Sequence, residues 1–261
     1  MLELSHICKT FNAKTNDEKR ALDDLSLSVN DGDFITIIGS NGAGKSTLFN
    51  AIAGTFITDS GKIVLDGINI TLMPEHKRAR RIGRIFQDPM RGSAPGMTIG
   101  ENLALAAGRG GWLSFVSPSD KKLFRERVAL LGMGLEDRME QPVGLLSGGQ
   151  RQALTLMMAT FNPPQLLLLD ECTAALDPET AAKVLDLIKD IVGREKLTCM
   201  MITHDMQSAL DMGNRTIMMA QGKIISDISG DERAALTVSD LLVKFKQVEG
   251  KELNNDRMLL I

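Results

Sequence analysis

The stretch Gly39-Ser40-Asn41-Gly42-Ala43-Gly44-Lys45-Ser46 fits the pattern GxxxxGK[ST] and follows a β-branched run, residues 34–38, that predicts a buried strand. Glycines let backbone N–H groups close around phosphate oxygens, and the helix that follows points its positive end at the same anion. Lys45 adds a cation for the β- and γ-phosphates, and the Ser46 hydroxyl is a magnesium ligand. We therefore expect a nucleotide-binding loop made of Gly39, Ser40, Asn41, Gly42, Ala43, Gly44, Lys45, Ser46 and Thr47.

The composition argues against a nucleic-acid-binding protein. The 261 residues include 30 Lys and Arg against 33 Asp and Glu, a formal charge of −3, and aromatic residues make up 4% of the chain. A nucleic-acid binder is normally basic and needs aromatic rings for stacking on bases. A basic stretch does occur at Lys77, Arg78, Arg80, Arg81 and Arg84. We interpret it as a solvated helix face rather than a nucleic-acid site.

The distribution of cysteines and apolar residues predicts a cytoplasmic protein. Cys8, Cys172 and Cys199 contain no CxxC pair, so we expect neither a disulfide framework nor a structural zinc site. No run approaches the ~18 apolar residues that a membrane helix needs. The first residues also lack an apolar core of signal-peptide length.

Strand and helix patterns alternate along the chain and predict an α/β fold. Residues 61–70, 81–86, 166–169 and 197–203 resemble strands. A helix is predicted to start at Asp177-Pro178 and to end before Gly193. The middle, roughly residues 90–160, has helical periodicity, and Thr237 with Asp240 forms a capping box for a helix in the tail. We expect a mixed, mostly parallel sheet, an inserted helical subdomain and a short helical tail.

The run 166–169 ends in two acidic residues, Asp170 and Glu171. An apolar strand that ends in acids is a weak signal alone and a strong one beside a phosphate loop. Asp170 is expected to hold Mg²⁺, directly or through water. Glu171 is expected to polarise a water molecule in line with the γ-phosphate.

A third motif, Leu146-Ser147-Gly148-Gly149-Gln150, precedes a helical stretch and ends 20 residues before Asp170. With its flanks it resembles the signature of the ATP-binding cassette family, the motor subunits of ABC transporters. The resemblance covers about residues 1–230 and implies a P-loop NTPase core that binds ATP and Mg²⁺. It also implies that Ser147, Gly148, Gly149 and Gln150 contact the nucleotide held by a second copy.

Further segments match the family in order. Phe86-Gln87-Asp88-Pro89 resembles the glutamine loop, which implies that Gln87 binds the metal and reports the state of the site to the helical lobe. Residues 173–177 resemble the D-loop, and Thr203-His204-Asp205 resembles the segment whose histidine senses the γ-phosphate. Phe11 stands where the family places an aromatic ring that stacks on adenine, with a plain core residue as the alternative. Cys172, where the family usually has proline, and Ala174, commonly serine, depart from the pattern.

The resemblance implies an ATPase whose two copies pair head to tail and drive a separate membrane permease from the inner face of the membrane. Uptake of a small solute such as an amino acid, with a solute-binding protein outside the cell, is the favoured interpretation. A non-transport ATPase of the iron–sulfur assembly type is the alternative. We expect an ATPase domain over residues 1–230, with a core lobe at about 1–88 and 160–230, a helical lobe at about 89–159, and a tail at 231–261.

Overall fold

The computed structural model of the protein describes residues 1–108 and 117–249. The chain forms two compact units. The first contains residues 1–82, 168–170 and those from 198 onward, and the second contains residues 83–167 and 171–197. No helix in the described ranges is long and apolar enough to cross a membrane.

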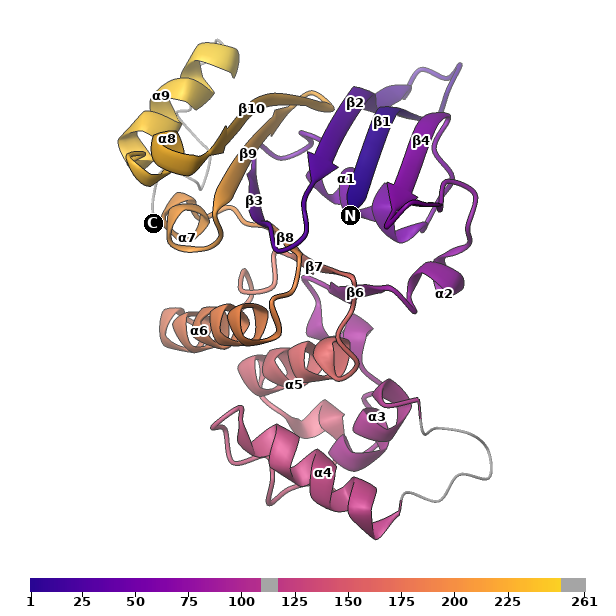
Figure 1. The fold of residues 1–261 in the computed structure, drawn as a ribbon, viewed down its shortest axis with the longest axis vertical. Coiled ribbons are helices and arrows are strands. Elements are labelled where there is room, and N and C mark those ends of the chain that lie inside the picture. Colours follow the sequence, from indigo (N-terminus) through magenta and orange to yellow (C-terminus); the bar gives the residue numbers. More distant parts are fainter. Residues whose placement is uncertain (109–116, 250–261) are drawn as a thin grey trace. The chain divides into compact units, whose positions relative to one another are not determined.

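A four-stranded sheet in the first unit has the order β2-β1-β4-β5, and Figure 1 shows β1, β2 and β4 side by side. Its strands are β1 (Leu2–Phe11), β2 (Lys19–Val29), β4 (Ser60–Leu65) and β5 (Ile68–Asn69). All pairs are antiparallel. Alternate residues of β1, Leu2 and Leu4, are buried, as the two-residue period of a half-covered strand requires.

The larger sheet has the order β10-β9-β3-β8-β7-β6. Its strands are β3 (Phe34–Ile38), β6 (Ile82–Ile85), β7 (Leu166–Asp170), β8 (Cys199–Ile202), β9 (Arg215–Ala220) and β10 (Lys223–Ser229). The strand β3 is parallel to both β8 and β9, whereas β10 is antiparallel to β9. All five residues of β3 are buried, as expected for a strand that is covered on both faces. The expected mixed, mostly parallel sheet is confirmed.

The single strand predicted over residues 61–70 is wrong. The segment is a hairpin in which β4 and β5 pair through Leu65 and Ile68. Asp66 and Gly67, between them, have φ angles of 49° and 75°. Two successive left-handed residues make the type I′ turn that matches the twist of paired strands, so the chain reverses there.

Five short helices are described in the first unit. They are α1 (Lys45–Ala53), α2 (Glu75–Arg78), α7 (Met206–Asp211), α8 (Gly230–Ala234) and α9 (Val238–Glu249). Figure 1 shows α7, α8 and α9 beside β9 and β10, and Leu241 and Phe245 of α9 are fully buried in a cluster with Ile38 and Met218. The predicted capping box at Thr237 and Asp240 is present, whereas residues 250–261 of the predicted tail lie outside the described residues.

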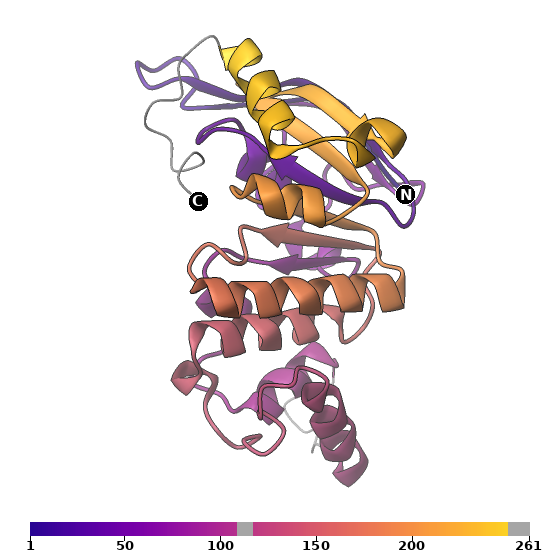
Figure 2. The same cartoon turned by 90° about the vertical axis from the view of Figure 1, so that its left-hand side faces the viewer.

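The second unit is mainly helical. It holds α3 (Ile99–Ala106), α4 (Pro118–Ala129), α5 (Gly148–Thr160), α6 (Pro178–Glu195) and two 3₁₀ turns, η1 (Pro89–Gly92) and η2 (Val143–Leu145). Leu103, Phe124, Val128 and Leu154 belong to one buried cluster. Figure 2 shows α5 and α6 running side by side. The helix α6 starts at the predicted Asp177 cap, but it continues through Gly193 to a left-handed Lys196, so the predicted end is wrong.

The basic stretch is not a solvated helix face. The helix α2 ends at Arg78, whose side chain is 2% exposed. Its guanidinium donates to four carbonyl oxygens, those of Ala51, Ile52, Thr71 and Met73, at 2.7–2.9 Å. Two of these acceptors belong to the last turn of α1, where helical carbonyls have no partner within the helix. Arg78 therefore holds α2 against α1, and burial lowers its pKa.

Candidate nucleotide site

The predicted phosphate loop connects β3 to α1. Gly44 is the N-cap of α1 and has φ 102°, and no side chain caps this helix end. A Cβ atom on Gly44 would lie 2.5 Å from the carbonyl oxygen of Ala21, so the position requires glycine for space as well as conformation. Uncapped N–H groups at a helix N-terminus, together with the helix dipole, favour an anion.

Lys45 folds back over this loop. It is buried, and its Nζ donates to the carbonyl oxygens of Gly39 and Ser40 at 2.5 and 3.0 Å. The ammonium thus stays beside the loop backbone, within the part of the loop where phosphate oxygens would bind. The predicted position of the loop, between a strand and a helix, is confirmed.

The acidic end of β7 meets the phosphate loop. Asp170 is the last residue of β7 and is 8% exposed, and its Oδ1 lies 3.4 Å from Ser46 Oγ. A hydroxyl oxygen and a carboxylate oxygen at this separation suit a shared Mg²⁺, which prefers oxygen ligands and binds proteins through one or two carboxylates plus substrate phosphates. Ser46 and Asp170 are therefore brought together in the way that the sequence predicts.

Glu171 and His204 also lie just beyond strand ends. Glu171 follows β7 with φ 47°, a left-handed conformation that costs a non-glycine residue energy and clusters at functional sites. His204 follows β8, which is parallel to β3, so it emerges at the same sheet edge as the phosphate loop. Asp205 next to it accepts hydrogen bonds from the N–H groups of Gln207 and Ser208 and so caps α7.

Phe11 ends β1, and its ring is 37% exposed. It contacts Phe56 edge to face with a centroid distance of 5.4 Å, and Lys9 Nζ lies 5.6 Å from its centroid. A ring held at one edge and still exposed over more than a third of its surface suits stacking better than a core role. The sequence did not predict the contribution of Phe56 or Lys9.

The signature motif forms the N-terminus of α5 in the second unit. Ser147 and Gln150 cap the helix reciprocally, since Ser147 Oγ accepts from the Gln150 N–H and Gln150 Oε1 accepts from the Ser147 N–H, both at 3.2 Å. The Ser147 hydroxyl keeps its own hydrogen for donation. A Cβ atom on Gly149 would lie 2.0 Å from Thr180 Cγ2, so this glycine lets α5 approach α6.

Gln87, the remaining predicted site residue, is exposed and follows β6, in the second unit. The adjacent Asp88 accepts a hydrogen bond from the Met90 N–H and caps η1. This cap fixes the backbone just after Gln87.

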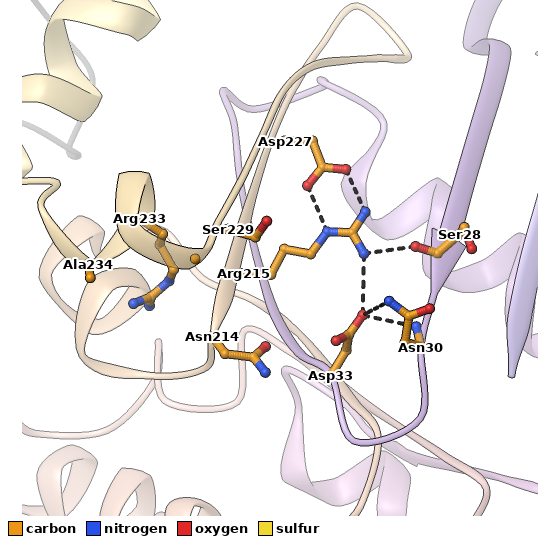
Figure 3. A pocket seen from close by; sticks show the side chains of 10 residues that line it. Ser28, Asn30, Asp33, Asn214, Arg215, Asp227, Ser229, Arg233 and Ala234 are labelled. Atoms are coloured by element: carbon orange, nitrogen blue, oxygen red, sulfur yellow. Dashed lines mark hydrogen bonds and ion pairs between the residues drawn. The ribbon is translucent and has the colours of Figure 1, made fainter.

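A polar hollow of about 830 Å³ lies elsewhere in the first unit (Figure 3). Arg215 dominates it and donates to both carboxylate oxygens of Asp227, to Asp33 and to the carbonyl oxygen of Ser28. Arg233 donates to three carbonyl oxygens at the end of α7. Hydrogen bonding to Asp227 raises the pKa of Arg215. Because these cations join β9, β10, α7 and the loop before β3, we assign the hollow a structural role.

Comparison with known proteins agrees with this arrangement. The family model described as ABC transporter matches residues 22–174. The chain belongs to the ABC transporter family. This cassette is 40% identical over 253 residues to the tyrosine transport ATP-binding protein of Clostridioides difficile, covering 94% of the chain and 99% of the relative. It is 36% identical to the methionine import ATP-binding protein MetN 1 of Staphylococcus aureus, with 86% of the chain and 64% of the relative covered.

Solved cassettes have the same fold. The ADP conformation of MJ1267 matches with a TM-score of 0.78 and 27% identity, over 97% of this cassette and 99% of that chain. The dimeric post-hydrolysis state of MJ0796 bound to ADP and Pi matches with a TM-score of 0.75 and 27% identity, over 88% of this cassette and 98% of that chain. The cassette is therefore an ATPase of the importer type, and the iron–sulfur assembly alternative is not favoured.

Proposed function

We propose that this cassette hydrolyses ATP between two copies of itself and transmits the resulting closure to a membrane permease. The observation that carries this proposal is the approach of Ser46 to Asp170 beside an uncapped helix end. Phe11 would stack on the adenine, and the loop N–H groups and Lys45 would bind the phosphates. Ser46, Asp170 and Gln87 would hold Mg²⁺, which when bound neutralises charge on the phosphate oxygens.

The roles of the remaining residues follow from their chemistry. Glu171 accepts a proton from the water that attacks the γ-phosphorus, and ADP leaves with the bridging oxygen. His204 hydrogen-bonds to the γ-phosphate. Ser147 and the N–H groups of Gly148 and Gly149 contact the γ-phosphate bound to the other copy, so ATP joins the two copies and hydrolysis separates them.

We further propose an amino acid as the transported substrate. The support is the 40% identity to a tyrosine transport ATP-binding protein over nearly its whole length. The dimeric state of a solved relative supports the pairing of two copies. A permease in the membrane, a solute-binding protein outside the cell and a position on the cytoplasmic face of the membrane complete this proposal.

Glu171→Gln tests the mechanism. Loss of a general base lowers the rate of hydrolysis by about 10²- to 10⁴-fold. The glutamine amide has nearly the same shape as the glutamate carboxylate, so ATP still binds but is not cleaved. We expect the variant to be a monomer without nucleotide and a dimer with ATP in size-exclusion chromatography. ADP does not support the dimer, and adding Ser147→Arg abolishes it. Hydrolysis by Glu171→Gln at the wild-type rate would remove Glu171 from its role.

A further inference from the structure

A lysine that the phosphate-loop motif does not include lies beside that loop. Lys19 is the first residue of β2, far from the loop in sequence. A Cβ atom built on Gly42 would lie 3.3 Å from Lys19 Nζ, which places the ammonium beside the loop backbone. Unlike Lys45, Lys19 is exposed, so its ammonium lies beside the loop and is open to solvent.

The ammonium of Lys19 has no hydrogen-bond or ion-pair partner among the residues that the structure describes. The neighbouring cations are engaged: Arg20 pairs with Asp23 at 2.6 Å, and Lys9 pairs with Asp59 at 2.8 Å. The adjacent carboxylate of Glu18 accepts the backbone N–H of Lys14 at 2.7 Å. An unpaired cation at a loop built for anions is available to a ligand.

Lys19 also lies directly opposite Phe11 in the β1–β2 pair. Side chains of directly opposed residues project from the same face of an antiparallel pair, with Cβ atoms about 4.5–5.5 Å apart. The proposed adenine platform and the Lys19 ammonium therefore share one face of the hairpin. A nucleotide whose base lies on Phe11 and whose phosphates lie in the loop passes along that face.

We propose that Lys19 is a nucleotide-binding residue whose ammonium pairs with the phosphate chain of ATP or ADP; this inference rests on the proposed function. Lys19 gives the site a second cation, supplied by the hairpin that carries Phe11. It contributes to binding both nucleotides and takes no part in the cleavage step.

The test compares Lys19→Gln with Lys62→Gln, a control at an exposed lysine of β4, by calorimetric titration of the full chain with MgATP and MgADP. An exposed charge-assisted contact predicts about a 3- to 10-fold loss of affinity for both nucleotides in Lys19→Gln. We expect no change in Lys62→Gln and an unchanged rate at saturating ATP. The loss shrinks as salt rises from about 0.05 to about 0.5 M, because the Debye length falls.

Three outcomes decide the inference. A salt-dependent loss confined to Lys19→Gln supports it. Affinities in Lys19→Gln equal to those in Lys62→Gln overturn it, and so does a salt-independent loss, which indicates that the ring of Phe11 has moved. Lys45→Ala separates the two proposals: if it binds ATP normally, the proposed function fails; if it loses ATP while Lys19→Gln does not, the assignment of Lys19 alone fails.

Discussion

Replacement of Arg78 by methionine removes a buried cation from the contact between α1 and α2. The four carbonyl oxygens that accept from its guanidinium lose charge-assisted hydrogen bonds, each worth about 1.5–3 kcal/mol. The variant no longer has to bury a charged guanidinium, and this saved desolvation cost offsets about half of the summed hydrogen-bond free energy. Methionine fills most of the vacated volume. We expect a net destabilisation of about 3–6 kcal/mol, which is large for a single substitution.

The matched control is Arg80→Met, since Arg80 belongs to the same basic stretch and is exposed. Surface substitutions of this kind change stability by about 0.5 kcal/mol or less. Thermal unfolding followed by circular dichroism measures both variants, and the midpoint of Arg78→Met is expected to fall by on the order of 10 °C. Equal midpoints for the two variants would refute the reasoning, because the four hydrogen bonds would then contribute nothing to stability.

Two further predictions concern β1. Phe11→Ala is expected to weaken ATP binding by about 1–3 kcal/mol, the usual loss of base stacking, and to leave the rate at saturating ATP unchanged. Steady-state kinetics measure both quantities. A lowered maximal rate at constant apparent affinity would show that Phe11 has a structural role instead. In the native protein a thiol reagent is expected to modify Cys8, because hydrogen bonds from Ser60, the Asp24 N–H and Arg20 lower the pKa of its thiol, whereas the other two cysteines are buried. Titration with a chromogenic disulfide checks this, and an unchanged signal in Cys8→Ser would contradict it.

Several features of the site could be predicted because they are encoded in short, contiguous segments. The phosphate-loop pattern consists of glycines, a lysine and a hydroxyl residue at fixed spacings within eight residues. The apolar strand that ends in two acidic residues is equally short, at six residues. These segments were placed correctly on strand ends and helix starts, and the order of the motifs was sufficient to indicate the family. The predicted capping box at Thr237 in the tail is equally local, since Asp240 lies three residues further along.

Contacts between distant segments were decided by the tertiary structure. Arg78 has the same side chain as its exposed neighbour Arg80, and its burial depends on carbonyl oxygens 26 and 27 residues earlier in the chain. Lys19 stands beside Gly42 because β2 starts over the phosphate loop, and no motif in residues 11–19 predicts that approach. A local pattern determines which backbone conformation a segment adopts. Which charges meet which partners depends on how the folded chain brings remote segments together, and hydrogen bonds and ion pairs act over a few ångströms of space regardless of sequence separation.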